Sequence, residues 1–206
     1  MIGIVDYGMG NLLSVYNAFD YLGEDVIVCK SPDSLKSIDR IVIPGVGAFK
    51  DCMERLNSTG FRSALDEEVL VKAKPTLGIC LGMQVMASKS YEFGEFDGLG
   101  WFDGEVVKIQ INDSGQKLPN IGWNEIQFKS DISLFKKIPN RSDFYLVHSY
   151  YLQCKDPDDQ IAYYEFAGQK ITAAVLKNNI FATQFHPEKS QDHGLSLLNN
   201  FINWKP

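Results

Sequence analysis

The 206-residue sequence has no apolar run long enough to cross a bilayer and no tract of basic residues. Its longest uncharged stretch, residues 75–88, contains 14 residues and is interrupted by glycines. A membrane-spanning helix needs about 20 apolar residues. The formal net charge is −6, whereas a nucleic-acid-binding protein is expected to have a basic stripe. We therefore expect no membrane contact and no nucleic-acid partner.

We also expect no secretion signal, no paired cysteines and no linker segments. Residues 1–6 have no basic region of the kind that opens a signal peptide, and they are typical of a first strand. The four cysteines show no short pairing, which indicates reduced thiols. With 45% hydrophobic and 22% charged residues, the chain can bury a substantial core. We expect a cytoplasmic protein with a single domain spanning residues 1–206.

One segment stands out, the apolar run Pro75–Gln84, in which Cys80 is flanked by Gly78 and Gly82. A strand that ends in a tight turn into a helix holds the turn residue in a strained conformation, and glycines on either side let strand and helix pass closely. The thiol would lie at a helix N-terminus, where the dipole and nearby N–H groups favour thiolate. The pattern predicts a nucleophile elbow with Cys80 as the nucleophile.

A base for this thiol is expected in the segment Gln184–Lys189. A nucleophilic thiol needs a base that takes its proton and returns it to the leaving group, and the base needs a third group to orient its ring. His186 and Glu188 can fill these roles, because residues i and i+2 of an extended stretch point the same way. Pro187 between them fixes φ.

The remaining cysteines and histidines have simpler interpretations. A free cysteine usually behaves as a small buried hydrophobe, and the other three lack paired glycines: Cys29, Cys52 and Cys154. His148 follows an apolar approach and is expected to be a hydrogen-bonded core residue. His193 lies in a polar helical start and is expected to be a solvated surface residue.

A glycine-rich loop follows the β-branched run at Ile41–Ile43. Acyl transfer needs N–H donors aimed at the oxyanion that develops on the attacked carbonyl, and glycines let a backbone approach that closely. A plain strand-to-helix turn is the alternative interpretation. Together with the elbow, the loop predicts an oxyanion site formed by four residues: Gly45, Val46, Gly47 and Leu81.

The first 80 residues alternate between short apolar runs and helical patterns. The runs are Ile2–Val5, Val26–Val28, Ile41–Ile43 and Thr76–Ile79, and the clearest helical patterns are Leu12–Leu22 and Phe61–Ala73. This alternation implies a parallel sheet with helices on both faces. The elbow and the glycine loop then lie at carboxyl ends of strands, where open α/β sheets place their sites.

After about residue 100 the pattern changes to strands joined by polar turns. The expected strands are Gly104–Ile111, Ile121–Phe128, Phe144–Gln153, Ile161–Phe166 and Ile171–Phe185, the last of them with a hairpin turn at Lys177–Ile180. A closing helix is expected from Ser190 to Trp204. The sequence therefore predicts an α/β fold with a mostly parallel central sheet, flanking helices and an additional antiparallel β region.

The pair Gly8 and Gly10 after the first strand invites a nucleotide-binding interpretation. The third glycine of the dinucleotide fingerprint is replaced by Leu13, and no acidic residue closes a second strand near Val28. We therefore expect no dinucleotide, no other cofactor and no metal site.

Together, these motifs resemble those of class I glutamine amidotransferases with a Cys-His-Glu triad, in that family's order and over nearly the whole chain. The motifs are Gly78–Gln84, Pro44–Gly47, His148–Tyr150 and His186–Ser190. Within the family the chain is most similar to the glutaminase subunits of imidazole glycerol phosphate synthases, in its short length, in Asp6–Asn11 and in Pro119–Asn124.

The resemblance implies hydrolysis of L-glutamine to glutamate and ammonia through a thioester on Cys80. It also implies that four residues contact the glutamine: Gln84, Glu92, Ser149 and Tyr150. A solvated charge is the alternative for Glu92. The implied partner is a (β/α)₈-barrel cyclase that forms a heterodimer with this chain and uses the ammonia to make imidazole glycerol phosphate and an aminoimidazole ribotide. The resemblance places three residues near that partner: Gly10, Asn11 and Trp123.

Two other functions remain open at this stage. Paralogous glutaminase subunits share these motifs and supply ammonia to an ATP-dependent sugar amidotransferase in surface-glycan synthesis. A cysteine peptidase or deglycase-like protein on the same scaffold is the alternative from another class, since the elbow serves many acyl chemistries. The glutamate two positions after His186 and the Pro44–Gly47 loop favour the amidotransferase.

Overall fold

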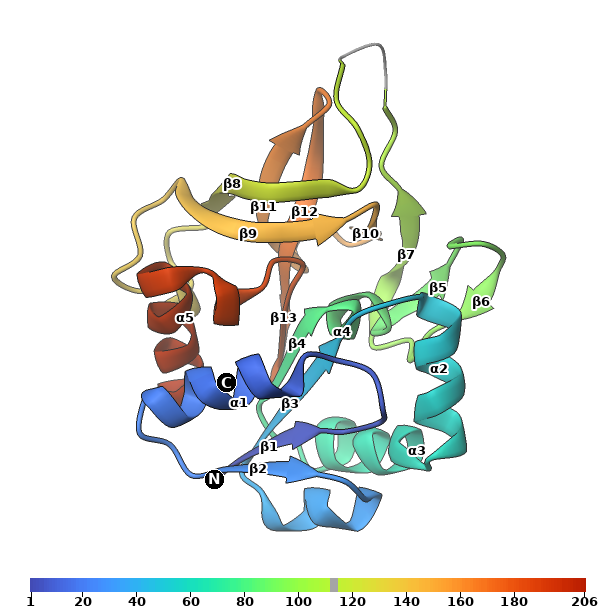
Figure 1. Cartoon of the computed structure of the whole chain (residues 1–206), viewed down its shortest axis with the longest axis vertical. Helices are drawn as coiled ribbons and strands as arrows, with labels where there is room; N and C mark the ends of the chain where they lie inside the picture. The colour runs from blue at the N-terminus through green and yellow to red at the C-terminus, as the bar shows by residue number, and fades with distance from the viewer. Residues whose placement is uncertain (112–114) are drawn as a thin grey trace.

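The computed structural model describes residues 1–111 and 115–206, which form two β-sheets with helices packed against them (Figure 1). The larger sheet has nine strands in the order β2-β1-β3-β4-β13-β12-β11-β8-β9. Its strands are β1 Ile2–Val5, β2 Val26–Cys29, β3 Arg40–Gly45, β4 Thr76–Cys80, β13 Ile180–Thr183, β12 Gln169–Lys177, β11 Gln160–Phe166, β8 Asn120–Phe128 and β9 Ser142–His148. The α/β fold class predicted from the sequence is confirmed.

The nine-stranded sheet is parallel in one half and antiparallel in the other. Pairings from β2 through β13 are parallel, and those from β13 through β9 are antiparallel. Most of the expected antiparallel strands therefore extend the central sheet, whereas the strand expected at Gly104–Ile111 lies in a second, smaller sheet. The hairpin predicted at Lys177–Ile180 joins the two halves, with Lys177 paired to Ile180.

Helices cover both faces of the parallel half, as the alternating pattern predicts (Figure 1). The helices are α1 Leu12–Tyr21, α2 Phe49–Ser58, α3 Phe61–Leu65, α4 Leu81–Gln84 and α5 Gln191–Asn203. Neighbouring residues of β3 enter two different cores: Val42 packs in the cluster that contains α1 and α5, and Ile43 packs in the cluster of α2 and α3. Strand alternation thus divides the apolar side chains between two layers.

A four-stranded sheet lies beside the carboxyl ends of the parallel strands. Its order is β10-β7-β5-β6, with β10 Tyr150–Cys154, β7 Phe102–Lys108, β5 Ala87–Ser90 and β6 Phe96–Asp97. The expected single strand Phe144–Gln153 is wrong, because the chain leaves the large sheet after His148 and enters the small sheet at Tyr150. Ser149 is the crossing point, so the strands on either side pair with different partners.

The expected helix Phe61–Ala73 is also interrupted. It is α-helical only over α3 and continues as the π-turn η2, Asp66–Val71, before Ala73 adopts a positive φ of 53°.

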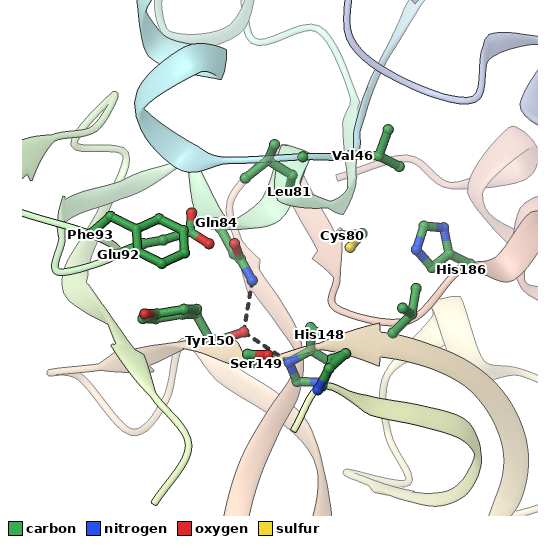
Figure 2. A pocket seen from close by; sticks show the side chains of 13 residues that line it. Val46, Cys80, Leu81, Gln84, Glu92, Phe93, His148, Ser149, Tyr150 and His186 are labelled. Atoms are coloured by element: carbon green, nitrogen blue, oxygen red, sulfur yellow. Dashed lines mark hydrogen bonds between the residues drawn. The ribbon is translucent and has the colours of Figure 1, made fainter. Parts of the chain in front are cut away.

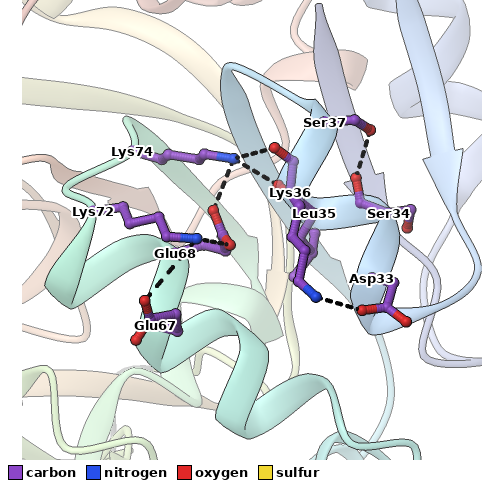
Figure 3. Close-up of polar contacts among 9 residues, drawn as sticks. All are labelled: Asp33, Ser34, Leu35, Lys36, Ser37, Glu67, Glu68, Lys72 and Lys74. Carbon is purple, nitrogen blue, oxygen red and sulfur yellow. Dashed lines mark hydrogen bonds and ion pairs between the residues drawn. The ribbon is translucent and has the colours of Figure 1, made fainter.

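Glu68, which is 2% exposed, lies in this turn and pairs with Lys72 at 2.7 Å and Lys74 at 2.8 Å (Figure 3). Burial raises the pKa of this carboxyl, but the two ammonium groups outweigh it, so the pKa is lowered. Lys74 also donates to the carbonyl of Leu35 at 2.6 Å in the 3₁₀ turn η1, Pro32–Ser37.

Within residues 1–111 and 115–206, no helix combines the length and the apolar character that crossing a membrane requires.

The close approach of strand and helix around Cys80 predicts a stability difference between two glycine substitutions. A Cβ on Gly82 would lie 1.9 Å from the carbonyl oxygen of Ile43, so Gly82→Ala is expected to lower the free energy of unfolding by about 3 kcal/mol. Gly100 has a φ of +73° with nothing within 4 Å, so Gly100→Ala is expected to cost about 1 kcal/mol from backbone strain alone. Urea unfolding of both variants measures this, and equal losses would contradict the steric argument.

Candidate active site

Cys80 ends β4 and directly precedes α4, in the strained conformation that an elbow requires. Its φ is 55° and its ψ is −109°, a region that a non-glycine residue rarely adopts. A Cβ at Gly78 would lie 2.9 Å from the carbonyl oxygen of Gly82. Both flanking glycines are therefore required by contact, as the sequence argument supposed. Because α4 is a single turn, its dipole at Cys80 is much smaller than that of a full helix.

His186 and Glu188 lie together behind the elbow, with His186 Nδ1 2.8 Å from Glu188 Oε1. Both side chains are buried, at 2% and 1% exposure. The expected extended geometry is wrong, because Glu188 lies in the 3₁₀ turn η4, Pro187–Lys189, which begins directly after His186. The turn folds the carboxylate back onto the ring, so the two side chains meet by a tighter route than strand alternation.

The second nitrogen of the His186 ring, Nε2, lies on the side of Cys80. Figure 2 shows a ring nitrogen of His186 turned toward the Cys80 sulfur, and Nε2 is buried with no hydrogen-bond partner among the described residues. Burial lowers the pKa of His186, but Cys80 and Glu188 raise it more, to about 10. The imidazole is therefore protonated at neutral pH, with a sulfur on one side and a carboxylate on the other.

A cavity of about 280 Å³ opens in front of Cys80 and His186, close to the lower size of small-molecule sites. Most of the residues predicted from the sequence line it (Figure 2). They are Val46, Gly47, Cys80, Leu81, Gln84, Glu92, Ser149, Tyr150 and His186. The fold thus brings together residues from the loop after β3, the elbow, the small sheet with its connecting loops, and the segment after β13.

Glu92 projects one carboxylate oxygen to the start of α2, where Oε2 accepts from the N–H of Phe49 at 2.6 Å. Burial raises the pKa of Glu92, and this hydrogen bond opposes the shift. The alternative of a fully solvated charge is therefore wrong, because Glu92 is half-buried at the pocket wall. Phe93 beside it is 84% exposed with a φ of 55°, and its ring meets Tyr150 edge-on at 6.2 Å.

The glycine loop after β3 lies against the elbow. Gly45 is paired with Cys80 in the sheet, and a Cβ there would lie 2.9 Å from the N atom of Gly82. Leu81 opens α4, so its N–H has no partner within that helix. Tyr7, which was not predicted to be a site residue, donates to the carbonyl oxygen of Pro44 at 2.6 Å and fixes the start of the loop.

Gln184, which was also not predicted to be a site residue, is completely buried, and its Nε2 lies 3.7 Å from the Cys80 sulfur. The only signal was its position two residues before His186, on the same segment. His148, expected to be a bonded core residue, is 6% exposed and bonded at both ring nitrogens. Among the described residues, no group of three or more His, Cys, Asp or Glu side chains is arranged to hold a metal ion.

Two of the three residues expected near a partner lie at the chain's first turn. Gly10 has a φ of 140°, and the Asn11 side chain caps α1 by accepting from Ser14 N at 3.3 Å. Asn11 also lines a small void that His186 and Glu188 share. Trp123 lies on β8, 46% exposed, with its ring edge-on to Tyr145 at 6.0 Å. These positions lie outside the main pocket.

Comparison with known proteins gives a consistent result. Residues 3–204 match the family model described as glutamine amidotransferase class-I. The chain is 48% identical over 202 residues to the imidazole glycerol phosphate synthase subunit HisH 1 of Campylobacter jejuni strain RM1221, covering 98% of this chain and 99% of that protein. It is 46% identical to subunit HisH of Chlorobaculum tepidum, covering 98% of each.

Solved structures agree at the level of the fold. A glutamine amidotransferase structure aligns with a TM-score of 0.75 at 15% identity, covering 98% of this chain and 97% of that one. PurLQS from Thermotoga maritima aligns with a TM-score of 0.73 at 18% identity, with the same coverage. The resemblance carried by the sequence motifs is confirmed. This chain belongs to the class-I glutamine amidotransferases, in the family of HisH subunits of imidazole glycerol phosphate synthase.

Proposed function

We propose that this chain hydrolyses L-glutamine to glutamate and ammonia through a thioester on Cys80. The observation that carries the proposal is the convergence of a strained cysteine with a buried His186–Glu188 pair at the base of one pocket. A nucleophile, an acid–base group and an orienting carboxylate are the parts that acyl transfer requires. Membership in the amidotransferase family supports glutamine as the amide.

In the first half-reaction, the Cys80 thiolate attacks the γ-carboxamide carbon of glutamine. His186 carries a proton at neutral pH, and a positive imidazolium beside the sulfur favours the thiolate. The oxyanion is stabilised by N–H groups of Gly45, Val46 and Gly47 and of Leu81. When the tetrahedral intermediate collapses, the C–N bond breaks and His186 passes its proton to the departing ammonia.

In the second half-reaction, the neutral His186 acts as base. It takes a proton from water, the oxygen attacks the thioester carbonyl, and the C–S bond breaks. Glutamate leaves, and thiolate and imidazolium are restored. Glu188 holds Nδ1 throughout, so that Nε2 always faces the reacting atoms.

The pocket wall supplies contacts suited to the α-amino acid end of glutamine. Glu92 presents a carboxylate that attracts the α-ammonium group, and its tie to the start of α2 fixes its position. Gln84, Ser149 and Tyr150 line the same cavity. We assign these four residues to substrate binding, in line with the family resemblance.

We also propose that the ammonia is delivered to a partner subunit for histidine biosynthesis. The relatives' printed names describe a subunit of imidazole glycerol phosphate synthase, so the acceptor reaction belongs to another chain. We assign that role to a (β/α)₈-barrel cyclase in a cytoplasmic heterodimer, docked near Gly10, Asn11 and Trp123. Free ammonia is mostly protonated at neutral pH, so a sheltered route would keep it reactive.

Substitution of the nucleophile tests the reaction. Cys80→Ala is expected to reduce glutamate release from glutamine by at least about 10³-fold, because removal of a covalent nucleophile cannot be replaced by the remaining groups. Cys154→Ser, which changes a half-buried thiol outside the pocket, should keep wild-type turnover. Coupled detection of glutamate, with the partner subunit present, measures both. Undiminished turnover in Cys80→Ala would refute the mechanism.

The raised pKa of His186 predicts a titration difference. In Cys80→Ala one of the interactions that raise this pKa is lost while burial, which lowers it, remains, so the pKa should fall below about 10. NMR of the imidazole C–H signals over pH 5–11 can follow it, since the chain has three histidines. An unchanged pKa would mean that the sulfur does not act on the ring.

The raised pKa of His186 also makes the stability of the fold depend on pH. The folded-state pKa of His186 lies above the ordinary value of about 6.5, so its protonation stabilises the fold fully below that pH. This contribution is lost as pH rises toward about 10.

Complementation tests the pathway. The chain, expressed in a histidine auxotroph that lacks its own HisH subunit but keeps the cyclase, is expected to restore growth without histidine, whereas Cys80→Ala is not. If the wild-type chain fails here while remaining an active glutaminase with a sugar amidotransferase, the surface-glycan alternative replaces the histidine pathway.

A further inference from the structure

The Cys80 sulfur has a polar contact that the proposed mechanism does not use. Gln184 Nε2 donates to Cys80 Sγ at 3.7 Å, within the range for a donor to sulfur. Gln184 is completely buried. Burying an amide costs free energy unless it is bonded, and the Cys80 sulfur is a partner for this amide nitrogen. A hydrophobic residue of similar size could not make this bond.

Gln184 is held in place by Gln84. One N–H of the Gln84 amide donates to Gln184 Oε1 at 3.0 Å, and the other donates to the carbonyl oxygen of Tyr150 at 2.8 Å. With its oxygen occupied in this way, the amide of Gln184 presents its nitrogen to the sulfur. The orientation of Gln184 is therefore set by hydrogen bonds and does not depend on the sulfur itself.

The carbonyl of Tyr150 is fixed in turn by a histidine. His148 Nδ1 lies 2.8 Å from this oxygen, and because a carbonyl only accepts, Nδ1 must carry the hydrogen. Nε2 then accepts from the hydroxyl of Tyr164 at 2.8 Å. The Tyr164 oxygen accepts from Asn120 Nδ2 at 3.1 Å. In this series of hydrogen bonds, each group can donate or accept in only one way that also satisfies its neighbours.

The side chains that form this hydrogen-bond chain are buried. Tyr164 is inaccessible, and His148, Asn120 and Gln84 are 6%, 6% and 5% exposed. Burial lowers the pKa of His148 to about 4, which keeps the ring neutral at pH 7 and preserves the tautomer that the geometry needs. Fully bonded polar networks of this kind are rigid, because every alternative arrangement leaves a buried group without a partner.

We propose that Gln184 acts directly on the reacting sulfur, stabilising the Cys80 thiolate by an N–H···S bond, and that His148 and Tyr164 are positioning residues that fix Gln184 through Gln84. This inference rests on the proposed function, in which Cys80 is the nucleophile. A donor to a charged sulfur is stronger than one to a neutral thiol, so the bond favours thiolate over thiol. Two residues of one segment, Gln184 and His186, thus both interact with the Cys80 sulfur.

The reactivity of Cys80 in the full chain tests the direct role. Alkylation by iodoacetamide is followed over pH 5–10 without glutamine, and mass spectrometry of the Cys80 peptide separates it from the other three cysteines. Gln184→Met is expected to move the midpoint of the alkylation profile up by about one pH unit, the size of a lost hydrogen bond to a charged group. Gln160→Met removes an amide bonded to Thr172 at 3.0 Å in the nine-stranded sheet and should match wild type.

A second pair of variants tests the positioning residues and keeps the proposal falsifiable if Gln184→Met does not fold. Tyr164→Phe removes only the hydroxyl that donates to His148, and we expect a smaller shift of the alkylation profile in the same direction. Tyr163→Phe, on the same strand, removes a hydroxyl bonded to Gln127 at 3.0 Å and should have no effect.

The outcomes separate the two proposals. A wild-type alkylation profile in Gln184→Met would overturn the direct role, and a wild-type profile in Tyr164→Phe would overturn the positioning chain. Wild-type protein that shows the expected alkylation changes on substitution but releases no glutamate from glutamine, even with its partner subunit, would support the sulfur contact and refute the proposed function.

Discussion

The active-site architecture depends on the contact between the backbone of Gly82 and the carbonyl of Ile43. Strand β3, strand β4 and the turn α4 meet here without side chains between them. Next to this contact, Cys80 has its positive φ, and Gly45 at the start of the glycine loop pairs with Cys80. A larger residue at any of these glycines would separate the nucleophile from the loop that we assign to the oxyanion.

The site also contains two buried histidines, one positively charged and one neutral at pH 7. His186 contacts a sulfur and a carboxylate, and its pKa is raised despite burial, whereas His148 contacts a carbonyl and a hydroxyl, and burial lowers its pKa. The difference comes from the partners, because only anionic groups repay the cost of a buried positive charge. One ring is suited to proton transfer and the other to holding a fixed hydrogen-bond direction.

Much of the fold could be predicted from local patterns. The β-branched runs of β1, β2, β3 and β4, the helix α1 and the turn between β12 and β13 follow from periodicity and turn chemistry. The break at Ser149 could not be predicted, because the residues on both sides have strand character and only the choice of pairing partners separates them. The π-turn at Asp66–Val71 was missed because nothing in a helical pattern reveals where the hydrogen bonds shift.

By itself, the sequence determined the nucleophile elbow and the glycine loop, because each is encoded by neighbouring residues whose spacing has a direct steric or chemical meaning. It also paired His186 with Glu188, but the 3₁₀ turn that brings them together appeared only in the structure. Only the tertiary structure decided how Glu92 is tied to α2, how Tyr7 fixes the loop at Pro44, and how Gln184 is linked to Asn120 through His148 and Tyr164. These contacts join residues up to about a hundred positions apart, as Gln84 and Gln184 are. Hydrogen bonds at that separation depend on sheet order, which no local pattern specifies.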